Sequence, residues 1–162
     1  MWRSKLLIFK SLTMNKVLFI CILLTGCFSI QAQSIKPADV PAAVTSVFKN
    51  NYPYATDAKW ENEDGMYEVS FKNANKDISV LYSYKGELAM IETPCEVSAL
   101  PANIMAYLTK NVVGAKITEA SKLVDAQEIV SYEVEVNNTD YLFTANGQFI
   151  LTRADDDDDN DK

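Results

Sequence analysis

The 162-residue chain contains no histidine. This absence excludes a Ser-His-Asp or Cys-His nucleophile system, imidazole acid–base catalysis and histidine-ligated zinc. Glycine is also scarce: of five glycines, Gly65, Gly86 and Gly147 stand in turn sequences rather than in a phosphate-binding loop. We therefore expect a protein that is not an enzyme and has no catalytic residues, no cofactor and no metal site.

Cysteine is limited to three residues, Cys21, Cys27 and Cys95. The first two fall in an N-terminal segment with the features of an export signal, so the mature chain would keep Cys95 alone and have no internal disulfide. We expect Cys95 to be a small buried apolar residue, the alternative being a reactive thiol.

Residues 1–32 resemble a signal peptide. Trp2 to Lys16 carries four basic residues and no acidic one, and the apolar run from Val17 to Leu24 follows. That run is shorter than the ~18 apolar residues of a membrane-spanning helix. We expect cleavage after Ala32 and a periplasmic or secreted product.

Two other interpretations of residues 1–32 are alternatives to cleavage after Ala32. The sequence ending at Cys27 also resembles a bacterial lipoprotein processing site, which would give a protein with a lipid anchor on that residue. A folded helix of the mature protein is the least favoured interpretation. Met14, which is followed by Asn15 and Lys16, matches the start of a typical signal peptide better than Met1 does. Met1 and Met14 are therefore alternative start codons.

The mature chain would be strongly acidic. Removing the four basic residues of the signal from the 15 in the chain leaves 11 against 22 acidic residues, a net charge of −11. Such a surface repels nucleic acid and anionic lipid. Residues 154–162 hold the acidic run Asp155 to Asp159, which we interpret as a disordered tail. Weak binding of divalent cations is the alternative, although the run lacks the glycine and spaced ligands of an EF-hand.

The remaining chain, residues 33–153, contains two similar halves. In the first half, an apolar pattern at spacings 0, 4, 7 and 8 predicts a helix, with Asp39 as its cap and Pro41 in its first turn. The pattern returns sixty residues later, where Ser98 opens the segment and Pro101 follows. The two sets are Val40, Val44, Val47 and Phe48, then Leu100, Ile104, Tyr107 and Leu108.

Alternating segments with turn residues between them predict four strands after each helix. Tyr67, Val69 and Phe71 would face the helix, and so would Ile78, Val80, Tyr82 and Tyr84. The first set of strands comprises 58–61, 66–71, 77–84 and 87–92, and the second 120–124, 130–136, 140–145 and 148–153.

We predict an α+β fold of two tandem units, each a helix on a four-stranded antiparallel sheet. The units would span residues 33–96 and 97–153. The sheet face turned away from each helix is the candidate binding surface. It would carry Glu68, Ser70, Leu81, Ser83, Glu133, Glu135, Leu142 and Thr144.

Two features of this surface admit a second interpretation. Glu133 and Glu135 share a face at roughly 7 Å, a separation that glycosidases use, but no apolar pocket nearby would raise one pKa. We interpret Glu133 and Glu135 as part of the solvent-exposed face of an amphipathic strand. Trp60 is either a binding anchor or a core residue under the first helix.

The order of these motifs resembles the PepSY-like family of exported bacterial proteins, also described as beta-lactamase-inhibitor-like. The motifs are the proline-led helix, Asn51-Tyr52-Pro53, Lys59-Trp60-Glu61, Tyr67-Glu68-Val69, Lys85-Gly86-Glu87 and then Leu100-Pro101, and the resemblance extends from about Ile35 to Arg153. It implies a fold similar to that of the beta-lactamase inhibitory protein, with two helix-plus-sheet units presenting a concave sheet. It further implies a protein-binding surface, but not inhibition of a beta-lactamase.

From these observations we expect a non-catalytic exported module that binds another envelope or secreted protein through the open sheet face. An acidic face predicts a partner with a basic surface, and the module would inhibit or chaperone an envelope enzyme. The alternative is a periplasmic sensor or carrier of a small ligand or divalent cation. An envelope enzyme is a third and less favoured class.

Overall fold

The computed structural model of the chain describes residues 33–63 and 65–154. The predicted signal peptide, its lipidation site at Cys27 and the acidic run after residue 154 lie outside these residues. Within them, two α-helices and eight strands follow one another in the order predicted for the repeat, and a short ninth strand precedes them.

The nine strands form one antiparallel sheet in which every strand pairs with its neighbour in sequence. Turn sequences such as Lys85-Gly86 and Asn146-Gly147 favour this meander, because they join strands that are consecutive in the chain. The strands are β1 (Gln33–Ile35), β2 (Thr56–Glu63), β3 (Met66–Asn73), β4 (Lys76–Ser83), β5 (Leu88–Pro94), β6 (Ile117–Asp125), β7 (Val130–Val136), β8 (Thr139–Thr144) and β9 (Phe149–Ala154).

The prediction of two separate four-stranded sheets was therefore incomplete. Strand β5 pairs with β6 through five residue pairs, which joins the two halves into one sheet. Strand β1, in a segment without predicted structure, adds to the edge of β2. These pairings occur because an unpaired strand edge leaves backbone donors and acceptors unsatisfied, and a neighbouring strand satisfies them.

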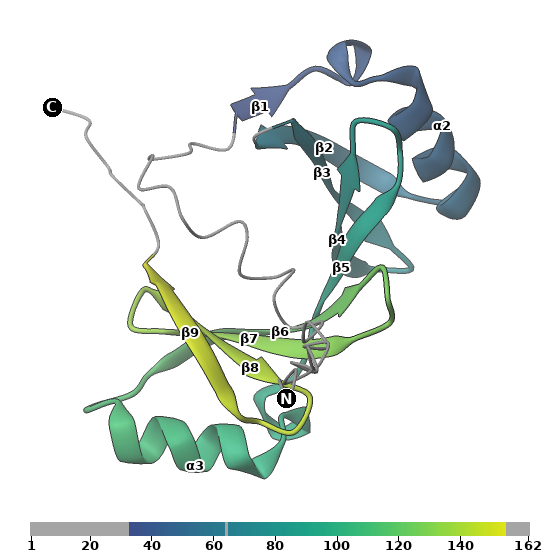
Figure 1. Cartoon of the computed structure of the whole chain (residues 1–162). Helices are drawn as coiled ribbons and strands as arrows, with labels where there is room; N and C mark the ends of the chain where they lie inside the picture. Colours follow the sequence, from purple (N-terminus) through teal and green to yellow (C-terminus); the bar gives the residue numbers. More distant parts are fainter. Residues whose placement is uncertain (1–32, 64, 155–162) are drawn as a thin grey trace, which may run out of the picture.

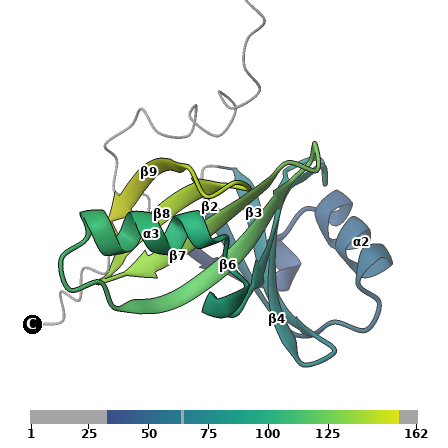
Figure 2. The same cartoon turned by 90° about the horizontal axis from the view of Figure 1, so that it is seen from below.

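The joined sheet bends sharply where its halves meet. Figure 1 shows β2–β4 standing at a steep angle to β6–β9, with helices α2 (Ala42–Asn51) and α3 (Ala102–Asn111) on the outer sides. Seen from below, α3 crosses the strands of the second half while α2 lies beyond the first half (Figure 2). The face without helices is the inner one, and we call it the concave face.

Each helix begins one residue after a proline rather than at the predicted cap. Pro41 and Pro101 are the N-caps of α2 and α3, and neither helix has a side-chain capping hydrogen bond. Asp39 instead ends a single-turn 3₁₀ segment, Pro37–Asp39, and Ser98 lies in the equivalent segment Val97–Ala99. The extended residues after these segments carry Asp39 and Ser98 away from the helix ends, so the predicted capping was wrong.

The first core forms between α2 and the outer face of β2–β4. Val44 and Phe48 of the helix are buried, as the spacing pattern predicts. The Phe48 ring meets those of Trp60 and Phe71 edge-on, at centroid distances of 5.3 and 5.0 Å. Trp60 is 4% exposed. It is therefore a core residue and not a binding anchor.

The second core repeats this arrangement with different side chains. Ile104 and Leu108 of α3 pack with Val134, Val136 and other residues of the second half. Ala120 takes the place of the larger Trp60, sixty residues earlier in the chain. At the open end of this core the Tyr107 and Phe149 rings stack at 4.8 Å. The duplication therefore extends from the chain order to the packing.

Cys95 packs against the second core and is partly buried. Desolvation, together with the nearby negative charge of Glu96, raises the pKa of its thiol. A raised pKa lowers the thiolate fraction at neutral pH and with it the reactivity of the group. Both observations favour the structural interpretation of this residue.

The residues predicted to face the helices lie on the helix-covered outer face of the sheet, with one exception. Val69, Phe71, Val80 and Tyr82 are buried in the first core. Tyr84 is 60% exposed, which contradicts the prediction. Strand β4 ends at Ser83, and Tyr84 belongs to the following turn, where the alternation of the strand no longer applies.

Two of the turn glycines also contact the helices. Gly147, with φ +75°, lies so close to α3 that an added Cβ would come within 2.9 Å of the Asn103 Cβ atom. Gly86, with φ +80°, makes the equivalent approach to Ala43 of α2 at 3.0 Å. Gly65 has a similar φ of +79°, but nothing lies within 4 Å of its Cβ position.

Gly147→Ala is therefore expected to destabilise the protein more than Gly65→Ala. Both substitutions place a Cβ in the left-handed conformation, which costs about 1–2 kcal/mol. Gly147→Ala additionally pushes α3 from the sheet, an overpacking cost of about 1–3 kcal/mol. Urea unfolding of both variants measures the difference, and equal losses would show that the contact with α3 carries no constraint.

A second prediction concerns Tyr82, whose side chain is fully buried. Burial raises the pKa of Tyr82 to about 12 from 10.0. Above pH 10 the unfolded chain loses this proton while the folded chain retains it, so stability falls as the pH rises from about 10 to 12. The loss reaches up to about 3 kcal/mol.

Tyr82→Phe removes this ionisation and should flatten the decline. At pH 7 its effect should be at most about 1 kcal/mol, because the buried Tyr82 hydroxyl has the Asn51 side chain nearby but forms no well-aligned hydrogen bond within the described residues. Denaturant unfolding between pH 8 and 11.5 measures both effects. Tyr54→Phe, at an exposed position, is the matched control and should keep the parent's pH dependence. The same steep decline in Tyr82→Phe would exclude Tyr82 as its source.

Candidate functional site

The concave face is defined by the residues that alternate with the core residues. On β3 and β4, Ser70 and Ser79 lie opposite each other and their hydroxyl oxygens are 2.8 Å apart. On β6 and β7, Ser121 lies opposite Glu133. Because the sheet is continuous from β1 to β9, these residues share one surface despite coming from different halves.

All eight residues predicted for the binding surface occupy this face. Glu68 lies opposite Leu81, and Glu133 lies opposite Leu142, so the two leucines hold the same position of the repeat. Glu135 lies opposite Asp140. The remaining residues of the predicted set are Ser70 opposite Ser79, Ser83 opposite Met66, and Thr144 opposite Ser131.

The two leucines differ in their exposure. Leu81 is half-buried, but Leu142 is only 4% exposed, so the prediction of one exposed leucine in each half was wrong for Leu142. Leu123 on β6, whose strand position also faces inward, is buried as well. The inner side of a bent sheet crowds its own side chains together, which removes Leu142 from solvent without a covering helix. Leu142 therefore contributes packing rather than contact area for a partner.

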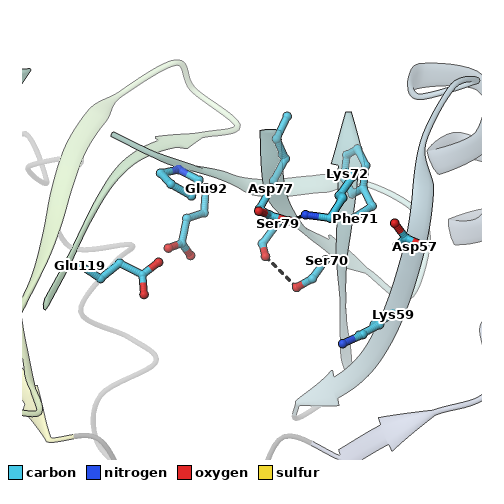
Figure 3. Close-up of a pocket in the computed structure, with 11 residues that line it drawn as sticks. Asp57, Lys59, Ser70, Phe71, Lys72, Asp77, Ser79, Glu92 and Glu119 are labelled. Carbon is cyan, nitrogen blue, oxygen red and sulfur yellow. Dashed lines mark hydrogen bonds and ion pairs between the residues drawn. The ribbon is translucent and has the colours of Figure 1, made fainter. Parts of the chain in front are cut away.

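A groove of about 550 Å³ crosses the first half of the concave face and reaches the bend. In Figure 3, Lys59 and the hydrogen-bonded Ser70 and Ser79 lie on one side, and Glu92 and Glu119 lie on the other. Lys72 forms an exposed ion pair with Asp77 at 2.8 Å, and this hydrogen bond raises the pKa of Lys72. The groove therefore has a mixed lining, with charges of both signs at the end that holds Lys59 and only carboxylates at the end that holds Glu92 and Glu119.

A second hollow of about 190 Å³ lies beyond the bend and is strongly acidic. We call it the acidic pocket. The described residues that line it are Glu92, Glu119, Ser121, Glu133, Glu135 and Asp140. Glu92 and Glu119 also line the groove, so the two hollows adjoin.

Three of these carboxylates form a row across neighbouring strands. Glu119 on β6 lies opposite Glu135 on β7, and Glu135 lies opposite Asp140 on β8. Like charges directly opposite each other destabilise a sheet. Arg153 of β9 pairs with Glu133, and Glu135 accepts a hydrogen bond of 2.6 Å from Thr118. These contacts orient two carboxylates of the pocket.

Ser121 is the one uncharged residue among those that line the pocket. Its side chain is buried, at 2% exposure for the residue, and its hydroxyl has no hydrogen-bond partner in the described part of the chain. A buried hydroxyl without a partner costs about 1–3 kcal/mol. Ser121 thus brings to the wall of the pocket a buried polar group that the described part of the fold does not use.

Sequence reasoning missed Lys59, Glu92, Glu119 and Ser121 as site residues. An alternation signal was present for Ser121, because it lies between Ala120 and Lys122 in the predicted strand 120–124. The structure places it directly opposite Glu133. Glu92 could not be placed, because its position beside Glu119 depends on the pairing of β5 with β6. No sequence signal indicated that pairing.

Glu133, one of the two carboxylates considered for glycoside hydrolysis, is held by Arg153. Among the described residues, no group of three or more acidic or cysteine side chains is arranged to hold a metal ion. No helix in residues 33–63 and 65–154 is long and apolar enough to cross a membrane.

Solved structures with a similar fold come from Bacteroides species. One from Bacteroides eggerthii, described among "putative periplasmic proteins", matches with a TM-score of 0.62 and 19% identity, over 70% of this chain and 88% of its own. One from Bacteroides uniformis matches with a TM-score of 0.61 and 23% identity over the same shares. A "BLIP-like protein" from Bacteroides fragilis matches with a TM-score of 0.57 and 21% identity, over 70% and 85%. At these identities the likeness shows the fold alone.

A search of curated protein sequences gave no match. The model of one protein family, described as "Putative beta-lactamase-inhibitor-like, PepSY-like", matches twice, over residues 28–90 and 80–151. The two matches correspond to the two helix-plus-sheet halves and together cover most of the chain. With its duplicated BLIP-like fold, the chain belongs to this PepSY-like family.

Proposed function

We propose that this chain is a non-catalytic exported module that binds another protein through its concave face. The observation that carries the proposal is the continuous hollow surface formed by the groove and the acidic pocket, which is rich in charged side chains and runs from β2 to β8. Such a surface is wide enough for an extended segment or loop of a partner. It is open rather than enclosed, and the acidic pocket is lined by carboxylates, which is unlike the enclosed apolar site typical of a small organic ligand.

Export is supported by two independent observations. The N-terminal segment has the composition of a signal peptide, and the similar protein from Bacteroides eggerthii is described as periplasmic. We therefore place this protein in the periplasm or outside the cell. Lipid attachment at Cys27 remains the alternative mode of processing.

The charge of the concave face indicates the kind of partner. Five carboxylates surround the acidic pocket, whereas the far end of the groove carries charges of both signs, including Lys59 and the ion pair of Lys72 with Asp77. Complementary potentials speed association and select partners. We infer a partner with a basic surface, and a role as inhibitor or chaperone of an envelope enzyme.

Site-specific photo-crosslinking tests this function. A photoreactive amino acid in place of Lys59, an exposed residue on the groove wall, is expected to capture one protein in an envelope extract of the source organism. Capture should fall when salt is raised from 0.05 to 0.5 M, because salt screens the attraction between exposed charges.

The matched control carries the photoreactive residue in place of Val113, which is almost fully exposed and follows the C-cap residue of α3. It should not capture the same protein. Identical capture from both positions, or no capture from the Lys59 position, would contradict binding through the concave face.

A further inference from the structure

We propose that the acidic pocket binds a single basic side chain, a guanidinium or ammonium group, presented by the partner protein. This inference rests on the proposed function and specifies the contact made at the bend of the sheet. The pocket would hold the cation between the row Glu119, Glu135 and Asp140 and the buried hydroxyl of Ser121. Glu92 closes the side that adjoins the groove.

The row of carboxylates gives the electrostatic reason. Glu119, Glu135 and Asp140 lie directly opposite one another on β6, β7 and β8. Arg153, which lies opposite Asp140 and pairs with Glu133, supplies one positive charge beside the five carboxylates that line the pocket, so the pocket keeps an excess of negative charge. A cation bound among the carboxylates attracts each of them and so offsets part of the repulsion between them. The effect is stronger here than on a convex surface, because Glu135 and Asp140 are half-buried and water screens them less.

Ser121 gives the second and independent reason. Its hydroxyl is buried, lines the pocket and has no partner within the described chain. A hydroxyl can accept a hydrogen bond from an N–H donor while the carboxylates accept others. A guanidinium carries five such donors and an ammonium three, so either group can satisfy Ser121 and the carboxylates together.

The size and spread of the pocket favour an organic cation over a metal ion. Its volume of about 190 Å³ exceeds the roughly 30 Å³ occupied by one water molecule, so it has room for a side chain and not only for an ion. Its carboxylates come from four strands, β5 to β8, and no three of the described acidic residues converge as metal ligands do. The groove next to it provides space for the backbone that would carry the side chain.

Titration with short peptides tests the proposal directly. The probes are Ac-Gly-Arg-Gly-amide, its lysine counterpart and its citrulline counterpart, which has the shape of arginine without the charge. Amide NMR shifts of the protein, expressed from the full-length chain, report binding and location. The arginine or lysine peptide should shift Ser121, Glu135 and their neighbours and bind at least roughly tenfold more tightly than the citrulline peptide.

Two variants with a matched control test the assignment of residues. Glu135→Gln should weaken binding of the basic peptides roughly tenfold, and Ser121→Ala should weaken it several-fold. Glu128→Gln, in the turn after β6, removes the same charge outside the pocket and should leave the affinity unchanged. Thermal melting without peptide separates folding from binding, since Ser121→Ala removes an unpartnered hydroxyl and should not lower the melting temperature.

Three results would overturn the proposal. The first is equal binding of the charged and citrulline peptides, and the second is a set of shifts away from β6–β8. The third is a response of the same residues to calcium chloride alone, at micromolar concentration and with displacement of the peptide, which would make the pocket a metal site.

The peptide titration and the crosslinking experiment can fail separately. Capture of a partner from the Lys59 position without peptide binding would retain the protein-binding function and reject the acidic pocket as its contact. Peptide binding without capture would retain the pocket and reject the proposed function.

Discussion

The pairing of β5 with β6 is the interaction on which the rest of the structure depends. Five residue pairs, from Met90 with Asp125 to Pro94 with Ser121, join two halves that each have their own helix and core. Without this ladder each half would end in an open strand edge. With it, the inner faces of both halves form one concave surface, and Glu92 of the first half faces the pocket of the second (Figure 3).

Each half has its own hydrophobic core between its helix and the outer face of the sheet. The concave face is therefore not needed for a core and can carry charged residues. Trp60 fills the first core between Phe48 and the sheet, whereas the smaller Ala120 stands at the matching place in the second. The second core is completed differently, with the Phe143 ring edge-on to Tyr107. Close packing constrains the total side-chain volume of each core and not the residue at each position. The two halves can therefore differ in their core side chains while keeping the same backbone fold. Apolar burial on the outer side supplies the stability that the inner side lacks.

The locally unfavourable features of the chain concentrate on that inner side. A row of opposing carboxylates and a buried hydroxyl without a partner occur together in the acidic pocket. Natural proteins depart from local rules mainly at functional sites, and the cost is offset elsewhere in the structure. The half-buried Leu81 and the buried Leu142 show the contrasting case, since they occupy matching positions and face the same way but differ in solvent access.

The sequence by itself determined the local elements. The apolar spacing of Val44 and Phe48 identified α2, the alternation through Val69 and Phe71 assigned the faces of β3, and the repeated order of motifs gave the duplication and the family. These signals are local, because helix and strand periodicities act over neighbouring residues. Only the tertiary structure decided that β5 pairs with β6, that the sheet bends, and that Glu92, Glu119 and Ser121 meet at one pocket. These outcomes depend on contacts between strands from different halves, whose register and curvature no local pattern encodes.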